Sequence, residues 1–230
     1  KINFDIFEPM VKEAIQAGVK RFIYASSSSV YGVKTEPNVS ESMSLEPLTD
    51  YSKFKAMCEE ILVKYKSEDF TPIVIRPATV CGYSPRQRLD LVVNILSNLA
   101  FNKKKITVFG GPQLRPNIHI DDMVDAYLLV LRAEKEKVSG EIYNVGYENQ
   151  SVGDLALAVK EVVGDDVEII KQTTNDNRSY HISSEKILND LGFKAKKTVK
   201  NAVEDLISAF KKNKFKEPLT NDNYFHIKKI

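Results

Sequence analysis

The spacing of apolar residues alternates between helical and strand-like patterns in the first 80 positions. Residues 6–17 carry apolar side chains at helical spacing, and Gly18 ends this segment. A short apolar strand over residues 21–26 follows, a second helix begins near Asp50, and an apolar run over residues 72–77 is bounded by prolines. Such a run is typical of a strand that is covered on both faces. The alternation of helix and strand predicts a parallel α/β sheet.

The pattern continues through shorter elements as far as Lys216, after which no clear period remains. No internal repeat occurs, and no apolar run approaches the roughly 20 residues that a membrane span requires. The predicted elements in this part are helices over residues 90–101, 121–131, 151–163, 184–191 and 199–210, and strands over residues 105–109, 141–146 and 167–171.

Polar segments follow two of the predicted strands. Residues 26–29 are four serines at the end of the first strand, and residues 77–82 follow the second. Ligands of parallel sheets bind at the carboxyl ends of the strands. We therefore expect these segments to lie beside one another and to form a site.

Tyr51 and Lys55 are separated by one turn of the second predicted helix and lie on the same face. A lysine ammonium at this distance can lower the pKa of a phenol, which is near 10 when unperturbed. A hydroxyl group from a neighbouring strand end would complete a proton-transfer site. This pair is therefore the centre of the predicted active site.

Composition restricts the classes of partner. The net charge of +2 gives no strong field that would favour nucleic acid or a membrane surface. Eight lysines against two acids between Lys194 and Lys216 are expected to form the solvated face of the last helix. Cys58 and Cys81 have no metal-site spacing and indicate two buried thiols in a reducing cytoplasm.

Several further stretches occur in an order that one enzyme family shares. The serine run leads into Val30-Tyr31-Gly32 and precedes Tyr51-x-x-x-Lys55. The others are Arg76-Pro77-Ala78-Thr79-Val80-Cys81-Gly82, Ile106-Thr107-Val108-Phe109-Gly110, Arg115-Pro116-Asn117-Ile118-His119-Ile120-Asp121-Asp122 and Ile142-Tyr143-Asn144-Val145-Gly146. Together they resemble the extended short-chain dehydrogenase/reductase family, and within it the NAD-dependent nucleotide-sugar epimerases and dehydratases of the UDP-glucose 4-epimerase type.

The resemblance implies roles for five residues at the strand ends and on the second helix. Ser27 corresponds to the catalytic serine or threonine, which also contacts substrate, and Tyr51 to the acid/base. Lys55 corresponds to the lysine that binds the nicotinamide ribose of NAD and lowers the pKa of the tyrosine. Ser26 and Pro77 are further implied cofactor contacts, Pro77 facing the nicotinamide carboxamide.

The resemblance also implies a substrate that is a sugar joined to a nucleoside diphosphate. Arginines suit a diphosphate because their donors are planar and permanently charged. The implied substrate contacts are Thr79 to the sugar, Phe109 to the base, Arg115 and Arg178 to the diphosphate, and Arg88 as a further candidate in a basic loop that also contains Arg86.

The implied fold is the C-terminal portion of a Rossmann-like parallel sheet with a smaller mixed α/β substrate-binding domain. Residues 1–82 and 119–146 would form the partial NAD-binding domain, residues 83–118 and 147–216 the substrate-binding domain, and residues 217–230 a tail. Family members form homodimers through the helix that carries Tyr-x-x-x-Lys and the helix before it. This would give Phe7, Val11 or Tyr65 an apolar partner.

The expected phosphate cradle of the cofactor has no counterpart in this sequence. None of the ten glycines belongs to a Gly-x-x-Gly-x-x-Gly or Gly-x-Gly-x-x-Gly turn after a strand. The resemblance implies that roughly 90–100 residues of a typical member precede the region matched here. We therefore expect these 230 residues to be a fragment that binds NAD weakly or not at all.

The leading functional prediction is a nucleotide-sugar 4-epimerase. Family dehydratases place Asp-Glu directly after the catalytic Ser/Thr, where this chain has Ser28 and Ser29. A dehydrogenase that leaves its hydride on NAD is the alternative, and residues 84–91 look like sequences in such relatives. A non-catalytic binding protein of the same fold is the alternative from another class. The sequence leaves the nucleotide and the sugar open.

Overall fold

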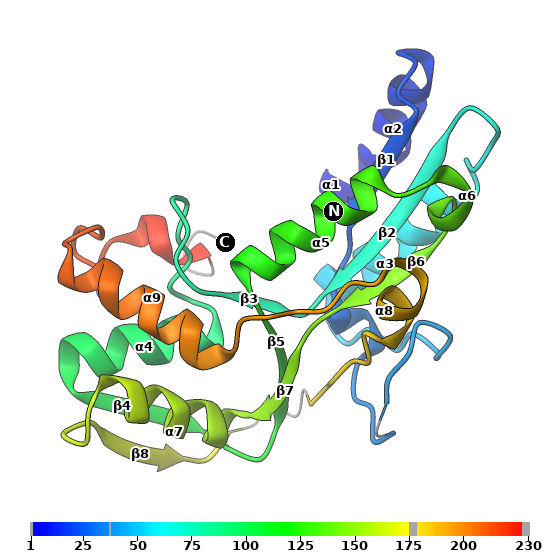
Figure 1. Cartoon of the computed structure of the whole chain (residues 1–230). Coiled ribbons are helices and arrows are strands. Elements are labelled where there is room, and N and C mark those ends of the chain that lie inside the picture. The colour runs from blue at the N-terminus through cyan, green and yellow to red at the C-terminus, as the bar shows by residue number, and fades with distance from the viewer. Residues whose placement is uncertain (1, 37, 175–178, 227–230) are drawn as a thin grey trace. The chain divides into compact units, whose positions relative to one another are not determined.

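A computed structural model of the chain describes residues 2–36, 38–174 and 179–226, and its elements fall into two units (Figure 1). Unit 1 is drawn from Lys1–Ala78, Val124–Gly146 and Tyr180–Lys194. Unit 2 is drawn from Thr79–Met123, Tyr147–Ser179 and Ala195–Ile230.

The sheet of unit 1 has three parallel strands in the order β1-β2-β6. They are β1 (Arg21–Ala25), β2 (Thr71–Pro77) and β6 (Ile142–Val145), and Figure 1 shows them side by side. β2 is the central strand, and its residues from Thr71 to Arg76 are buried. The predicted parallel α/β sheet is therefore confirmed.

Helices of unit 1 cover this sheet. Two helices, α2 and α3, pack on one face, where Phe7 and Val11 of α2 meet Cys58 and Leu62 of α3 above Val74. A capping box between Thr49 and Ser52 fixes the start of α3. The helical elements are α1 (Ile2–Asp5), α2 (Phe7–Gln16), η1 (Ser28–Tyr31), α3 (Asp50–Val63), α6 (Lys135–Val138) and α8 (Glu185–Leu191), while α5 (Ile120–Arg132) begins in unit 2 and continues into unit 1.

Unit 2 contains two small sheets. In one, β5 (Leu114–His119) pairs in parallel with β3 (Thr79–Cys81) and antiparallel with β7 (Glu148–Ser151). In the other, β4 (Lys105–Phe109) pairs in parallel with β8 (Glu168–Gln172). Three helices, α4 (Val92–Lys103), α7 (Val152–Val163) and α9 (Val199–Lys211), supply most of the apolar core of this unit.

The unit boundaries differ from the predicted domain boundaries. Residues 180–194 lie with unit 1, because the Ser184 hydroxyl donates to the Gly146 carbonyl and α8 packs near β6. In the predicted tail, Tyr224 and Phe225 pack against the core of unit 2. The assignment of these parts to cofactor and substrate stays a prediction. Among the described residues, no helix combines the length and apolar character that crossing a membrane requires.

Candidate active site

The serine run lies at the carboxyl end of β1. The Ser26 backbone N–H donates to the Ile75 carbonyl at 2.8 Å, which continues the pairing of β1 with β2. Ser27 is extended and is the N-cap of η1, where its hydroxyl accepts from the Ser29 N–H at 3.2 Å and lies 2.8 Å from the Ser29 hydroxyl. The run therefore leaves the strand and starts a helical turn, as four small hydroxyl residues favour.

Tyr51 and Lys55 lie in the first turns of α3, on the side that meets the end of β1. The Lys55 ammonium donates to the Ala25 carbonyl at 2.6 Å, one residue before Ser26. Its nitrogen is 5.7 Å from the centre of the Tyr51 ring and 4.8 Å from the centre of the Tyr24 ring. The structure thus places Lys55 at the start of the serine run, and the exposed Tyr51 ring lies next to Lys55.

Burial and a neighbouring negative charge have opposite effects on the pKa of Lys55. Burial lowers the pKa of the Lys55 amine, while the negative charge of Glu59 acts in the other direction. Burial also raises the pKa of the Tyr24 phenol, so this ring stays neutral beneath the lysine. A cation held this close to Tyr51 favours the phenolate form of that side chain. The arrangement can therefore supply a hydroxyl group that accepts and returns a proton.

The other two predicted cofactor contacts have different surroundings. Pro77 is the last residue of β2, paired with Val145 of β6, and is partly exposed at the carboxyl end of the sheet. Ser26 is buried, and its hydroxyl donates to Glu59. Because this hydroxyl group already binds Glu59, it gives no support to the predicted contact between Ser26 and the cofactor. That contact stays a prediction.

The predicted substrate contacts lie in unit 2. Thr79 on β3 and Arg115 on β5 belong to neighbouring strands, because Thr79 pairs with Asn117. Phe109 ends β4 and is 54% exposed, so it is not part of the apolar core of unit 2. Arg178 lies outside the described residues.

Arg88, the remaining predicted substrate contact, forms a two-point pair with Asp90. Its Nε lies 3.0 Å from Oδ1 of Asp90 and its Nη2 lies 3.1 Å from Oδ2. Burial alone would raise the pKa of the Asp90 carboxyl, but the hydrogen bonds and charge of Arg88 hold it below its usual value. A diphosphate that used Arg88 would have to share it with this carboxylate.

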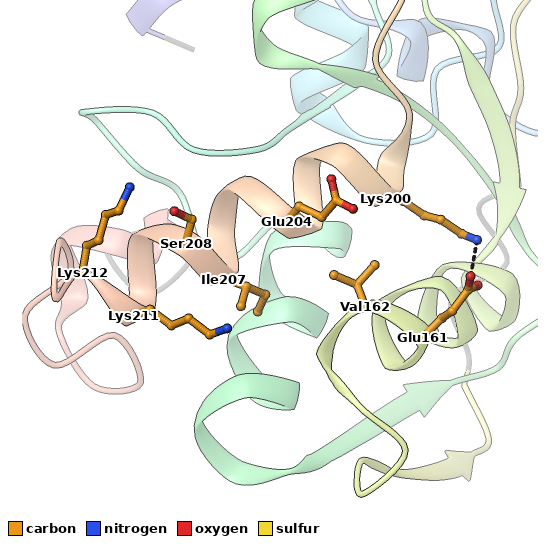
Figure 2. A pocket seen from close by; sticks show the side chains of 8 residues that line it. All are labelled: Glu161, Val162, Lys200, Glu204, Ile207, Ser208, Lys211 and Lys212. Carbon is orange, nitrogen blue, oxygen red and sulfur yellow. Dashed lines mark hydrogen bonds and ion pairs between the residues drawn. The ribbon is translucent and has the colours of Figure 1, made fainter.

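A groove of about 600 Å³ lies between α7 and α9 in unit 2 (Figure 2). Its floor contains Val162 and Ile207, and an ion pair of 2.6 Å joins Lys200 to Glu161 across it. Figure 2 shows further lysines of α9 and the residues after it along the groove. None of the predicted site residues that the structure describes lines it. Its lysines fit the predicted solvated face of the last helix.

His119 ends β5 and has a structural role. Its Nδ1 accepts from the Asp121 N–H at 3.1 Å, and its Nε2 lies 3.1 Å from Asp205 Oδ2 on α9. Its side chain is buried, whereas Asp121 binds Lys197 at the surface. His119, Asp121 and Asp205 are residue types that can ligate a metal ion. Their nitrogen and oxygen atoms, however, already bind one another and Lys197. His119 therefore fixes the start of α5.

Comparison with known proteins decides the family. The family model described as "NAD dependent epimerase/dehydratase family" matches residues 1–146, which include the serine run, Tyr51, Lys55 and Pro77. The chain belongs to this family. The resemblance drawn from the sequence motifs is thereby confirmed.

Relatives of this epimerase/dehydratase chain include both reaction types. It is 30% identical over 223 residues to a dTDP-D-glucose 4,6-dehydratase of Homo sapiens, covering 89% of this chain and 60% of the relative. It is 34% identical over 165 residues to the "Uncharacterized UDP-glucose epimerase YtcB" of Bacillus subtilis, covering 70% of this chain and 51% of the relative. The chain therefore spans about half to three fifths of the length of these relatives.

A solved structure supports the same fold. The UDP-glucuronic acid 4-epimerase of Bacillus cereus, in complex with UDP-glucuronic acid and NAD, superposes with a TM-score of 0.80 at 24% identity. The match covers 91% of this chain and 67% of that protein. At this identity the match supports the fold alone.

The epimerase/dehydratase chain also contains a buried ion pair that the sequence motifs do not indicate. Glu59 of α3 and Arg76 of β2 are both 3% exposed and lie 2.6 Å apart. The signal was present in the sequence, because an arginine interrupts the apolar run 72–77 and a glutamate lies one turn after Lys55. A buried arginine needs a carboxylate partner, but the sequence alone does not say which one.

Proposed function

We propose that the complete protein is a nucleotide-sugar 4-epimerase that uses NAD. Family membership supports the NAD-dependent chemistry, and relatives named for dTDP-D-glucose and UDP-glucose support a sugar nucleotide as substrate. Tyr51, Lys55 and Ser27 at one strand end support proton transfer at a sugar hydroxyl. A non-catalytic protein of this fold would have no use for that set.

The choice of epimerase over dehydratase depends on the two residues after Ser27. Eliminating water across two carbons requires an acid and a base, which family dehydratases place at these positions as Asp-Glu. Here Ser28 is buried and the Ser29 hydroxyl lies 2.8 Å from that of Ser27. Serine hydroxyls cannot act as that pair at neutral pH. This observation carries the proposal.

In the proposed mechanism, Tyr51 removes the proton from the sugar 4-hydroxyl while hydride leaves the same carbon. Lys55 stabilises the phenolate before this step, and the Ser27 hydroxyl orients the sugar oxygen. NAD, when bound, accepts the hydride and returns it. After the 4-keto sugar has turned over, Tyr51 gives the proton back to the oxygen of the new epimer.

The residues present fit one end of NAD. The amine of Lys55, the hydroxyl of Tyr51 and the backbone of Pro77 suit the nicotinamide ribose and its carboxamide, since they combine a cation, a donor and a strand end. The pyrophosphate end needs a glycine-rich turn before a helix N-terminus, and none of the ten glycines forms one. Thr79, Phe109, Arg88, Arg115 and Arg178 remain our proposed contacts to the sugar nucleotide.

We also propose that the complete protein is a homodimer through α2 and α3. Ile6, Met10 and Met57 are exposed apolar residues on these helices and on the residue before α2. Phe7 and Val11, which the sequence offered for this surface, are instead buried in the core of unit 1. Sedimentation of the complete protein measures the oligomeric state, and a monomer at all concentrations would contradict this assignment.

The reaction is tested by incubating the complete protein and NAD with a panel of UDP-, dTDP- and GDP-hexoses. We expect the 4-epimer of at least one sugar to form while NADH absorbance stays flat, because the hydride is returned in each turnover. Net accumulation of NADH would show a dehydrogenase. A 4-keto-6-deoxy sugar would show a dehydratase despite Ser28 and Ser29.

A further inference from the structure

A continuous chain of buried polar side chains crosses unit 1 beneath the candidate active site. The Ser26 hydroxyl donates to Glu59, which also accepts from Arg76 Nε at 3.1 Å and from Arg76 Nη2 at 2.6 Å. The other arm of Arg76 donates to the Tyr31 hydroxyl at 2.7 Å, and that hydroxyl donates to Asn144 Oδ1 at 2.8 Å. All five residues are buried.

This chain connects the elements that carry the proposed catalytic residues. Ser26 immediately precedes Ser27 at the end of β1. Glu59 follows Lys55 by one turn on α3, on the stripe that continues from Tyr51. A side-chain hydrogen bond from Ser26 to Glu59 links the serine run to α3.

Burying two charges is a poor way to gain stability. An apolar pair of similar volume is often as stable as a buried ion pair, because the desolvation penalty offsets the attraction. A buried network whose donors and acceptors are all hydrogen-bonded does fix the positions of its side chains, since any other arrangement would leave a buried polar group without a partner. Both Glu59 oxygens are engaged, so rotating this carboxylate would break several bonds together.

We propose that Glu59 is a positioning residue that, through Ser26, fixes the end of β1 against α3. The register set in this way holds the Ser27 hydroxyl at its working distance from the Tyr51 phenol. Displacements of about 1 Å between reacting groups can lower rates by about 100-fold, so this link matters for turnover more than for binding. The inference rests on the proposed function. It gives Ser26 the role of joining β1 to α3 through Glu59.

The test compares Ser26→Ala, Glu59→Gln and the double variant in the complete enzyme. Ser26→Ala removes only the hydroxyl link and leaves the pair of Glu59 with Arg76 in place. We expect kcat to fall about 10- to 100-fold with KM for the sugar nucleotide and the affinity for NAD unchanged. The double variant should be no slower than the slower single variant, because both changes act through the same link.

Ser97→Ala is the matched control. Ser97 is also a fully buried serine with one side-chain hydrogen bond, to the Val93 carbonyl, but it lies on α4 in unit 2. Its kcat should equal that of the wild type. A Ser26→Ala variant as fast as Ser97→Ala, or additive effects in the double variant, would overturn the proposal. Weaker NAD binding by Ser26→Ala would also overturn it by assigning Ser26 to the cofactor.

Failure of the proposed function is distinguishable from failure of this inference. If the wild-type enzyme catalyses another reaction on a sugar nucleotide, the same comparison of kcat and KM applies to that reaction. If it turns over none of them, amide hydrogen exchange over residues 26–31 becomes the readout. Exchange there should be faster in Ser26→Ala than in Ser97→Ala, and equal rates would overturn the link between β1 and α3.

Discussion

Replacing Tyr51 by Phe is expected to lower kcat of the complete enzyme by about 100- to 10,000-fold, the usual contribution of a positioned acid/base. The substitution removes only the hydroxyl oxygen, and the exposed ring in the first turn of α3 has room to remain. KM for the sugar nucleotide should change little, because the phenol acts on the reacting proton. Steady-state kinetics on the epimerisation measures both constants.

Tyr65→Phe provides the matched control for this prediction. Tyr65 follows the end of α3, and its hydroxyl donates to Glu8 at 2.5 Å on α2. Removing that hydroxyl should leave kcat unchanged. A Tyr51→Phe enzyme that retains the wild-type rate would contradict the proposed acid/base and would favour a non-catalytic protein of this fold.

Replacing Arg76 by Met is expected to lower the free energy of unfolding by about 3–5 kcal/mol, as for other buried pairs that lose one partner. Glu59 would keep its burial and lose its charged partner, and the Tyr31 hydroxyl would lose a donor. Chemical denaturation of wild type and variant measures the difference.

A second variant separates the two causes of this loss. The double variant Arg76→Met with Glu59→Leu removes both charges, so it should recover much of the stability lost in the single variant. The exposed Arg86→Met serves as a control and should lie within about 0.5 kcal/mol of the wild type. An Arg76→Met variant as stable as Arg86→Met would contradict the account of the buried pair.

The elements that the sequence predicted best are those whose signal is local. The strand over β2 is an apolar run between prolines, and α3 carries an apolar stripe. Tyr51 and Lys55 could be placed together because one helical turn fixes their separation. The serine run could be placed near them because parallel strands end at a common edge.

The elements that the sequence missed depend on contacts distant along the chain. β7 is Glu148-Asn149-Gln150-Ser151, which has no apolar residue and exists through its pairing with β5. The partner of Arg76 is 17 residues away on another element, so its burial could not be deduced from spacing. Phe7 and Val11 were apolar in the sequence, but only packing shows that they face the core.

The central claim is that hydride leaves one sugar carbon and returns to the same carbon. In the most direct measurement, the complete enzyme is incubated in ordinary water with a sugar nucleotide that it turns over. The sugar of this substrate carries deuterium at C4. Mass spectrometry and NMR of the product should find the 4-epimer with deuterium still at C4. Deuterium on C6 of a 4-keto-6-deoxy sugar, or its accumulation in the reduced cofactor, would contradict the account.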